Sequence, residues 1–245
     1  MQQPHLPSIS VVVPAYNEAA RITRALTTIT QFLNGGGYEW ELIVVDDGST
    51  DTTHALVTTL VAAFPDRLRL LGDALNRGKG AAVKAGVLAA TKSMVLFTDA
   101  DQATPIEELP KFITALQSAD VAIGSRYQAQ SRVVQRQPLS RRILSRAGNF
   151  AIRLATGLPF TDTQCGFKAM NRDAARTIFS RLTIDRWGFD IELLVIARAH
   201  RLRVVELPVS WHDGGESKLD ASHAALTTLR ELLVIRRNLT KGRYA

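Results

Sequence analysis

Two aspartates, two positions apart, are the clearest candidates for chemistry in this chain. Asp99 and Asp101, separated by Ala100, directly follow the apolar run 93–98, which favours a buried strand. Carboxylates at this spacing can hold a hard divalent cation such as Mg²⁺ or Mn²⁺, either both directly or one through water. A cation bound there would neutralise a diphosphate. The same spacing is common in turns at strand ends, so this interpretation needs support from other segments.

A short glycine-containing segment could meet a phosphate. Gly78, Lys79 and Gly80 open a predicted helix, so backbone N–H groups and one ammonium could face an anion. No P-loop pattern is present, and the turn after the first predicted strand, 14–18, contains no glycine. The sequence therefore argues against P-loop ATPases and dinucleotide-dependent enzymes.

A phosphatase of the haloacid-dehalogenase type also places two aspartates after an apolar strand. That class expects Thr or Val two residues after the second aspartate, where this chain has Ala103. The pair also lies in the middle of the chain rather than after the first strand. Both departures make a phosphatase a distant alternative.

The positive charge of the chain is concentrated in one segment. The formal net charge is +7, from 30 Lys and Arg against 23 Asp and Glu. The stretch 121–161 has no acidic residue and contains Arg126, Arg132, Arg136, Arg141, Arg142, Arg146 and Arg153. Such a block predicts an anionic partner, or else a solvated basic face. Few aromatic residues accompany it and no nucleic-acid-binding motif is present, so we expect an anionic membrane surface or a phosphorylated substrate rather than nucleic acid.

The elements that must position these residues alternate between strands and helices. Strands are predicted at 8–14, 40–46, 68–71 and 93–98, with helices at about 18–33, 51–64 and 79–91. The second half predicts helices at 107–118, 174–182, 189–200 and 221–238, strands at 121–124 and 204–211, and an amphipathic helix within 143–154. This order indicates an α/β fold with a mostly parallel sheet. Ligands bind such sheets at the carboxyl ends of the strands, where both aspartates are expected.

The composition predicts a globular protein without a membrane span. The chain has 245 residues, 46% of them hydrophobic, which can form a full core. The longest apolar runs, such as 193–197, are far shorter than a membrane helix, and residues 1–8 do not resemble a signal peptide. A single cysteine, Cys165, excludes an internal disulfide. We therefore expect a cytoplasmic protein.

Four segments in order carry a resemblance to a known family. They are Val11-Val-Val-Pro-Ala-Tyr-Asn-Glu18, Val44-Val-Asp-Asp-Gly-Ser-Thr-Asp51, Asn76-Arg-Gly-Lys-Gly80 and Asp99-Ala-Asp101. Together they resemble the inverting glycosyltransferases of family 2, which have the Rossmann-like GT-A fold. Downstream, Ile123-Gly-Ser-Arg-Tyr127, Asp162-Thr-Gln-Cys-Gly-Phe-Lys168, Phe189-Asp-Ile-Glu-Leu193 and Glu216-Ser-Lys-Leu219 look like the subgroup acting on polyprenyl and dolichyl phosphates, most like its dolichyl-phosphate β-glucosyltransferases.

The resemblance implies a role for each matching residue. It places the nucleotide sugar against Pro14, Tyr16, Glu18, Asp46, Asp47, Lys79, Asp99, Ala100 and Asp101. Within that set Asp47 would read the base, and Asp99 with Asp101 would hold the metal. Asp101, Arg126 and Asp162 are implied as catalytic residues. The acceptor would meet Arg142, Arg146, Gln164, Ser217 and Lys218.

The implied activity is inverting transfer of a hexose to a polyprenyl phosphate. Two departures from the mannosyl-type pattern, Gln102 directly after Asp101 and no arginine within 211–215, favour UDP-glucose, with GDP-mannose next. Alternatives are a hydroxyl acceptor, soluble or glycolipid, and an inactive relative that binds lipid or nucleotide. One domain is expected at 1–219, with a donor half at 8–106 and an acceptor half at 107–219. A basic C-terminal helix, 220–245, and the arginine-rich segment are expected to dock the protein peripherally on a membrane.

Overall fold

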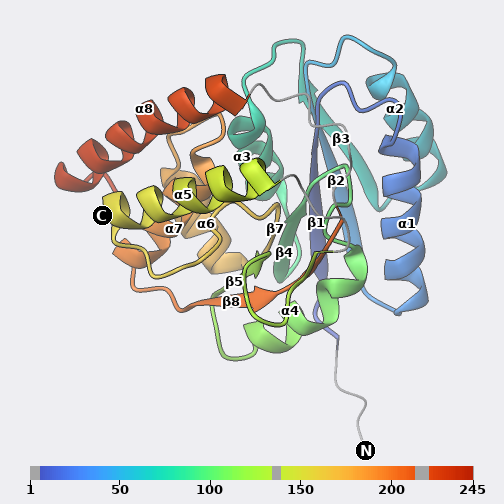
Figure 1. Ribbon diagram of the computed structural model, residues 1–245. Coiled ribbons are helices and arrows are strands. Elements are labelled where there is room, and N and C mark those ends of the chain that lie inside the picture. The colour runs from blue at the N-terminus through green and yellow to red at the C-terminus, as the bar shows by residue number, and fades with distance from the viewer. Residues whose placement is uncertain (1–5, 134–138, 213–220, 245) are drawn as a thin grey trace, which may run out of the picture.

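One seven-stranded sheet forms the centre of the protein (Figure 1). The computed structural model describes residues 6–133, 139–212 and 221–244. The sheet order is β3-β2-β1-β4-β7-β5-β8. The strands are β1 (Ile9–Ala15), β2 (Trp40–Asp47), β3 (Leu68–Asp73), β4 (Met94–Thr98), β5 (Val121–Ser125), β7 (Phe167–Asn171) and β8 (Val204–Pro208). The sheet continues from the expected donor half into the expected acceptor half, so the two halves share one core.

The sheet is parallel except at one strand. β1, β2, β3 and β4 pair in parallel, as do β5 and β8, whereas β7 runs antiparallel between β4 and β5. The mostly parallel α/β sheet expected from the sequence is confirmed. A separate two-stranded parallel sheet joins β6 (Arg132–Val133) to β9 (Ser210–Trp211).

Helices cover both faces of the sheet. They are α1 (Ile22–Gly35), α2 (Thr53–Ala63), α3 (Lys79–Ala89), α4 (Leu109–Leu116), α5 (Leu139–Thr156), α6 (Arg172–Arg181), α7 (Phe189–Ala199) and α8 (Ala221–Thr240), with a 3₁₀ turn at Ile106–Glu108. Successive strand residues point to opposite faces, so Val12 packs with α3, α6 and α7 while Val11 and Val13 pack with α1, α2 and α4. Two apolar layers therefore enclose the sheet.

Two expected elements differ in the structure. No strand was predicted at 167–171, where β7 forms, because Lys168 interrupts the apolar pattern. Its ammonium is fully buried and pairs with Asp190 of α7, which only the folded chain supplies. The single strand expected at 204–211 is divided at Val209 into β8 and β9, since Ser210 and Trp211 leave the main sheet to pair with β6.

Candidate active site

The turn after β1 is tied to the turn after β2. Asn17 adopts a left-handed conformation (φ 55°), and its side-chain oxygen accepts the backbone N–H of Thr50 at 2.8 Å. The Asn17 N–H donates to Ser49 Oγ at 2.9 Å, and the Glu18 N–H donates to Thr53 Oγ1 at 2.8 Å. This network fixes Pro14, Tyr16 and Glu18 at the carboxyl edge of the sheet. Tyr16 is 45% exposed, so its ring is open to a ligand.

The two aspartates that end β2 are buried and face different neighbours. Asp46 accepts the Ser49 N–H at 3.0 Å and lies 3.0 Å from the ring nitrogen Nδ1 of His54. Asp47 accepts the backbone N–H groups of Arg77 and Gly78, at 2.8 and 2.9 Å. The Asp47 carboxylate thus anchors the loop that leads into Lys79. This anchoring role was not expected from the sequence.

Lys79 and Asp99 form an ion pair at the centre of the edge. Lys79 Nζ lies 2.6 Å from Asp99 Oδ1 and 5.8 Å from the ring centre of Trp187. Burial alone would lower the pKa of Lys79, but the charges of Asp99, Asp190 and Asp101 raise it above its usual value. Lys79 is therefore a permanent cation beside the Asp-Ala-Asp motif.

A tight turn carries the two aspartates of that motif. Gln102 has φ 51°, and its side-chain nitrogen donates to the Asp99 carbonyl at 3.1 Å. The Asp101 carboxylate accepts the Ala103 N–H at 2.9 Å. Desolvation and the charge of Asp99 raise the pKa of Asp101. Two carboxylates whose charges repel in this way would be stabilised by a cation.

The donor atoms around this turn fit a divalent cation. Asp99 Oδ1 has Lys79 as its one described polar partner, and the buried Gln102 Oε1 has none among the described residues. Within the described ranges, no group of three or more His, Cys, Asp or Glu residues gathers to hold a metal. A cation at Asp99 and Asp101 would therefore complete its coordination with water and substrate oxygens, as Mg²⁺ commonly does.

Arg126 and Asp162 form a second charged pair. Asp162 is fully buried and accepts Nε and Nη2 of Arg126, at 2.7 and 2.9 Å, and the Arg126 backbone N–H at 3.0 Å. Burial alone would raise the pKa of Asp162, but Arg126 holds it below its usual value. The guanidinium carbon also lies 5.5 and 5.7 Å from the ring centres of Tyr127 and Trp211.

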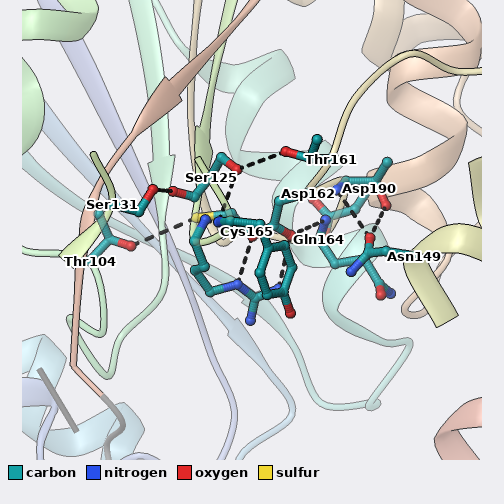
Figure 2. A network of polar contacts seen from close by, with 12 residues as sticks. Thr104, Ser125, Ser131, Asn149, Thr161, Asp162, Gln164, Cys165 and Asp190 are labelled. Carbon is teal, nitrogen blue, oxygen red and sulfur yellow. Dashed lines mark hydrogen bonds and ion pairs between the residues drawn. The ribbon is translucent and has the colours of Figure 1, made fainter. Parts of the chain in front are cut away.

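Glu206 of β8 holds the backbone of the segment that carries Asp162. It accepts the backbone N–H of Asp162 at 2.8 Å, and both the N–H and the hydroxyl of Thr161, at 3.0 and 2.6 Å. Gln128 also donates to it at 3.1 Å. Figure 2 shows Asp162 among its polar neighbours, with Thr161 and Gln164 beside it. Glu206 was not predicted as a site residue, because an acidic residue within a predicted strand forms no recognisable motif.

The segment 162–166 joins the two charged pairs. At one end Asp162 binds Arg126, and at the other the Gly166 carbonyl accepts the Asp99 N–H at 3.2 Å. Four residue steps span at most about 14 Å, so Asp162 lies within that distance of Gly166, which contacts the Asp99 carboxylate. The antiparallel pairing of β4 with β7, in register Thr98 to Phe167, brings this segment to Asp99.

The acceptor residues expected from the sequence are only partly placed. Gln164 is half-buried, and its backbone N–H donates to Asp162 at 3.3 Å. Arg142 and Arg146 lie on α5, but their side chains are outside the described part of the structure. Ser217 and Lys218 lie outside the described residues altogether.

Sequence comparison identifies the family. Residues 10–179 match the family model described as glycosyl transferase family 2. The chain belongs to glycosyltransferase family 2. The carboxyl edge of β1, β2 and β4, the Asp-Ala-Asp turn and the Arg126–Asp162 pair all lie within the matched residues. The likeness inferred from the motifs is thereby confirmed.

Curated relatives of this glycosyltransferase cover most of the chain. A dolichyl-phosphate β-glucosyltransferase of Trichomonas vaginalis is 40% identical over 86% of this chain and 66% of its own length, just under two thirds. The enzymes of the same name from Dictyostelium discoideum and Saccharomyces cerevisiae are 35% and 34% identical, over 93% and 96% of this chain and 73% and 76% of their own lengths.

Solved structures show the same fold. Glucosyl-3-phosphoglycerate synthase from Mycobacterium tuberculosis, in complex with Mn²⁺, UDP and glucosyl-3-phosphoglycerate, matches with a TM-score of 0.69 and 23% identity, over 94% of this chain and 80% of that chain. This likeness shows that the glycosyltransferase has the GT-A fold. In the described ranges of the chain, no helix is both long and apolar enough to cross a bilayer.

Proposed function

We propose that this glycosyltransferase moves glucose from UDP-glucose to a polyprenyl phosphate, dolichyl or undecaprenyl, with inversion at the anomeric carbon. The product is a β-linked glycosyl phospholipid. The observation that carries the proposal is the Arg126–Asp162 pair, which presents a cation rather than a base to the acceptor. The names of relatives at 33–40% identity support the same acceptor and sugar.

The donor half would hold the nucleotide at the edge formed by β1, β2 and β4. Tyr16 offers an aromatic face for the base, with Pro14 and Glu18 beside it. Asp47 is proposed to read the base together with Asp46, although its carboxylate also accepts two loop N–H groups. Each carboxylate oxygen has two lone pairs, so a further hydrogen bond from the base remains compatible with this anchoring.

The diphosphate would lie over Lys79 and the Asp99-Ala100-Asp101 turn. Asp99 and Asp101, with Mg²⁺ or Mn²⁺ bound, would supply Lewis-acid stabilisation of the leaving diphosphate. Lys79 contributes a fixed positive charge, and its ion pair with Asp99 holds that charge at the same edge. Both charges favour departure of UDP.

Arg126 is proposed to receive the acceptor phosphate. Its pairing with Asp162 uses Nε and Nη2, so Nη1 remains a donor for a ligand. A phosphate monoester has a second pKa of about 6 and is mostly a dianion at neutral pH. It can therefore attack the anomeric carbon without losing a proton to the enzyme. Attack opposite the leaving UDP produces the inverted, β-linked product.

Asp162 is proposed to position Arg126 instead of accepting a proton. It is fully buried, its pKa is held below its usual value, and each of its oxygens accepts a hydrogen bond from Arg126. A carboxylate in this state is a weak base. This geometry disfavours the alternative in which a sugar hydroxyl is the acceptor, because a hydroxyl would need a base near its proton.

The acceptor lipid also implies a place for the reaction. We propose that the protein works as a peripheral protein at the cytoplasmic face of an anionic membrane. The basic residues of the segment 132–153 and of the C-terminal helix would meet the lipid headgroups. Arg142, Arg146, Ser217 and Lys218 remain proposed ligands of the acceptor phosphate.

A transfer assay tests the proposal. Radiolabelled UDP-glucose and GDP-mannose would be offered in parallel with a polyprenyl phosphate and Mg²⁺ or Mn²⁺, and the lipid phase extracted. We expect label from UDP-glucose in an acid-labile lipid, and loss of transfer with EDTA. The Asp99→Asn variant should lose transfer, whereas Asp66→Asn, on a surface turn, is the matched control.

Other outcomes of the assay would point elsewhere. Label from GDP-mannose alone would change the sugar and nucleotide. Metal-dependent donor binding without lipid labelling, followed by transfer to a sugar hydroxyl, would replace the phosphate acceptor. Neither donor binding nor transfer under any of these conditions would indicate the inactive relative.

A further inference from the structure

Large apolar side chains are exposed on two neighbouring helices. Among the described residues, ten large hydrophobic side chains are exposed, and five of them lie on α5 and α8. Leu154 is 79% exposed, Phe150 66% and Leu233 65%. The two helices pack against each other and run side by side in Figure 1, α5 in yellow and α8 in red. Exposed apolar residues gathered in this way indicate an interaction surface.

Each of the two helices has one inner and one outer face. In α8, Leu232, Ile235 and Asn238 are buried, at the three-residue spacing of one face. Leu233 lies on the opposite face. Three of its four helical neighbours at three and four positions are exposed arginines, namely Arg230, Arg236 and Arg237.

The described part of α5 repeats this arrangement. Asn149 and Ile152 are buried on its inner face. Phe150 and Leu154, four residues apart, share the outer face, and Arg153 beside them is exposed. We call the following residues the α5/α8 face: Phe150, Arg153, Leu154, Arg230, Leu233 and Arg237.

No acidic residue in the sequences of these two helices would repel an anionic partner at the α5/α8 face. The sequence of α5 contains none, and that of α8 contains only Glu231. The Glu231 carboxylate is directed inward, where it accepts the Gly188 backbone N–H at 2.7 Å. The face therefore combines apolar side chains with cations, the composition of helices that lie in a membrane interface.

Both helices also contact the loops of the active site. On the inner side of α5, Asn149 Oδ1 accepts the Thr163 hydroxyl at 3.4 Å, one residue from Asp162. On the inner side of α8, Glu231 binds Gly188, next to Trp187, whose ring lies against Lys79. The α5/α8 face is thus the outer side of two helices whose inner sides contact the loops that carry both charged pairs.

We propose that the α5/α8 face lies on an anionic lipid bilayer, with Phe150, Leu154 and Leu233 inserted among the headgroups. The arginines around them bind lipid phosphates. This deepens the proposed function, on which it rests, because it identifies the surface through which a membrane-embedded acceptor reaches Arg126. Exposed arginines on both helices, Arg153 on α5 and Arg230 and Arg237 on α8, match a surface of repeated phosphates better than a protein partner.

Vesicle sedimentation tests the face without any substrate. The full chain would be mixed with phosphatidylcholine vesicles containing about 30% phosphatidylglycerol, a fraction chosen because attraction grows with anionic lipid. We expect binding that weakens with salt and at least a tenfold weaker partition coefficient in Leu154→Asp with Leu233→Asp. Leu88→Asp, at an exposed leucine of α3, is the matched control and should bind like the wild type.

A second pair of variants separates insertion from charge. Leu154→Ser with Leu233→Ser keeps every charge, so a loss of binding there reports apolar contact. Arg230→Gln with Arg237→Gln keeps the apolar residues, and we expect about a fivefold loss for each arginine. If the double variant Leu154→Asp with Leu233→Asp bound vesicles as well as the wild type does, the proposal would be overturned. A wild type that does not bind vesicles but is dimeric, with a monomeric double aspartate variant, would also overturn it. That result would assign the face to a second copy of the chain.

Activity distinguishes failure of this surface from failure of the proposed function. The double aspartate variant should transfer glucose to a short, water-soluble polyprenyl phosphate like the wild type, but lose at least tenfold with acceptor embedded in vesicles. Wild-type vesicle binding with no transfer to either acceptor would reject the function and keep the surface. Transfer to both acceptors, unchanged in the variant, would reject the surface and keep the function.

Discussion

The α-carbon of Gly166 lies against the carboxylate of Asp99. A β-carbon at position 166 would lie 2.0 Å from Asp99 Oδ2 and 2.4 Å from its Cγ, far inside van der Waals contact. The Gly166 carbonyl meanwhile accepts the Asp99 N–H. The Asp-Ala-Asp turn and the 162–168 segment, more than sixty residues apart in the sequence, are therefore fitted to each other at this glycine.

We expect Gly166→Ala to displace the Asp99 carboxylate. Metal-dependent UDP binding, measured by calorimetry, should weaken at least tenfold, and transfer should fall further. Gly35→Ala is the matched control, because a β-carbon there meets nothing within 4 Å at the exposed end of α1. Normal metal-dependent binding in Gly166→Ala would show that Asp99 does not hold the cation in this position.

Glu206→Gln tests the support beneath Asp162. A glutamine side chain has one acceptor oxygen instead of two, so it cannot accept the Asp162 N–H and both Thr161 donors together. One buried donor loses its partner, at a cost of about 1–3 kcal/mol in the free energy of unfolding. Because Arg126 would shift, the KM for the acceptor should rise at least fivefold while UDP affinity stays unchanged. Glu107→Gln, on the exposed 3₁₀ turn, is the control; parallel losses of donor and acceptor affinity would indicate only general loosening.

Asp162→Asn should change how stability depends on pH. Because Arg126 holds the folded pKa of Asp162 below its unfolded value of 3.8, the pair stabilises the fold fully above that pH and less as pH falls through the folded pKa. Above pH 5 the variant should be about 3 kcal/mol less stable, and the difference should shrink towards pH 2. Urea unfolding across this range measures it, and a constant difference would contradict the assignment.

The same variant also separates the two acceptor classes. If Asp162 positions Arg126, Asp162→Asn should reduce transfer to a polyprenyl phosphate without abolishing it, because the acceptor needs no base. The pH profile of the residual activity should keep the wild-type shape. Complete loss of transfer would assign Asp162 the role of base instead.

Cys165 should be unreactive in the folded protein. Its side chain is buried, and burial together with the charge of Asp162 raises the pKa of the thiol to about 11. Little thiolate therefore exists at pH 8, and a reagent has no access to it. Titration with a chromogenic disulfide should give no rapid reaction without denaturant and one thiol per chain in urea. Rapid reaction of the native protein would mean that the 162–166 segment opens.

Much of this protein follows from local patterns. The apolar runs before Pro14, Asp46 and Asp99 predict parallel strands, and the carboxyl ends of such strands meet at one edge of the sheet. Lys79 and Asp99 could therefore be placed together from the sequence, and their ion pair confirms this placement. The motifs also sufficed to identify the family.

Other features depend on contacts that no local pattern records. Asp162 reads as a catalytic carboxylate in its motif, yet its burial and its three hydrogen bonds from Arg126 emerge only when β5, β7 and β8 pair. Likewise, Glu206 and the buried Lys168–Asp190 pair gain their meaning from distant partners.

The division has a physical reason. Backbone periodicity and turn chemistry act over a few residues, so the amino-acid sequence by itself determined the helices, most of the strands and the edge that carries Asp99 and Asp101, but not β7. The protonation state and the role of a buried charge depend on which opposite charge the fold places beside it. Only the tertiary structure therefore decided that Asp162 belongs to Arg126, that Gly166 must lack a side chain, and that α5 packs against α8.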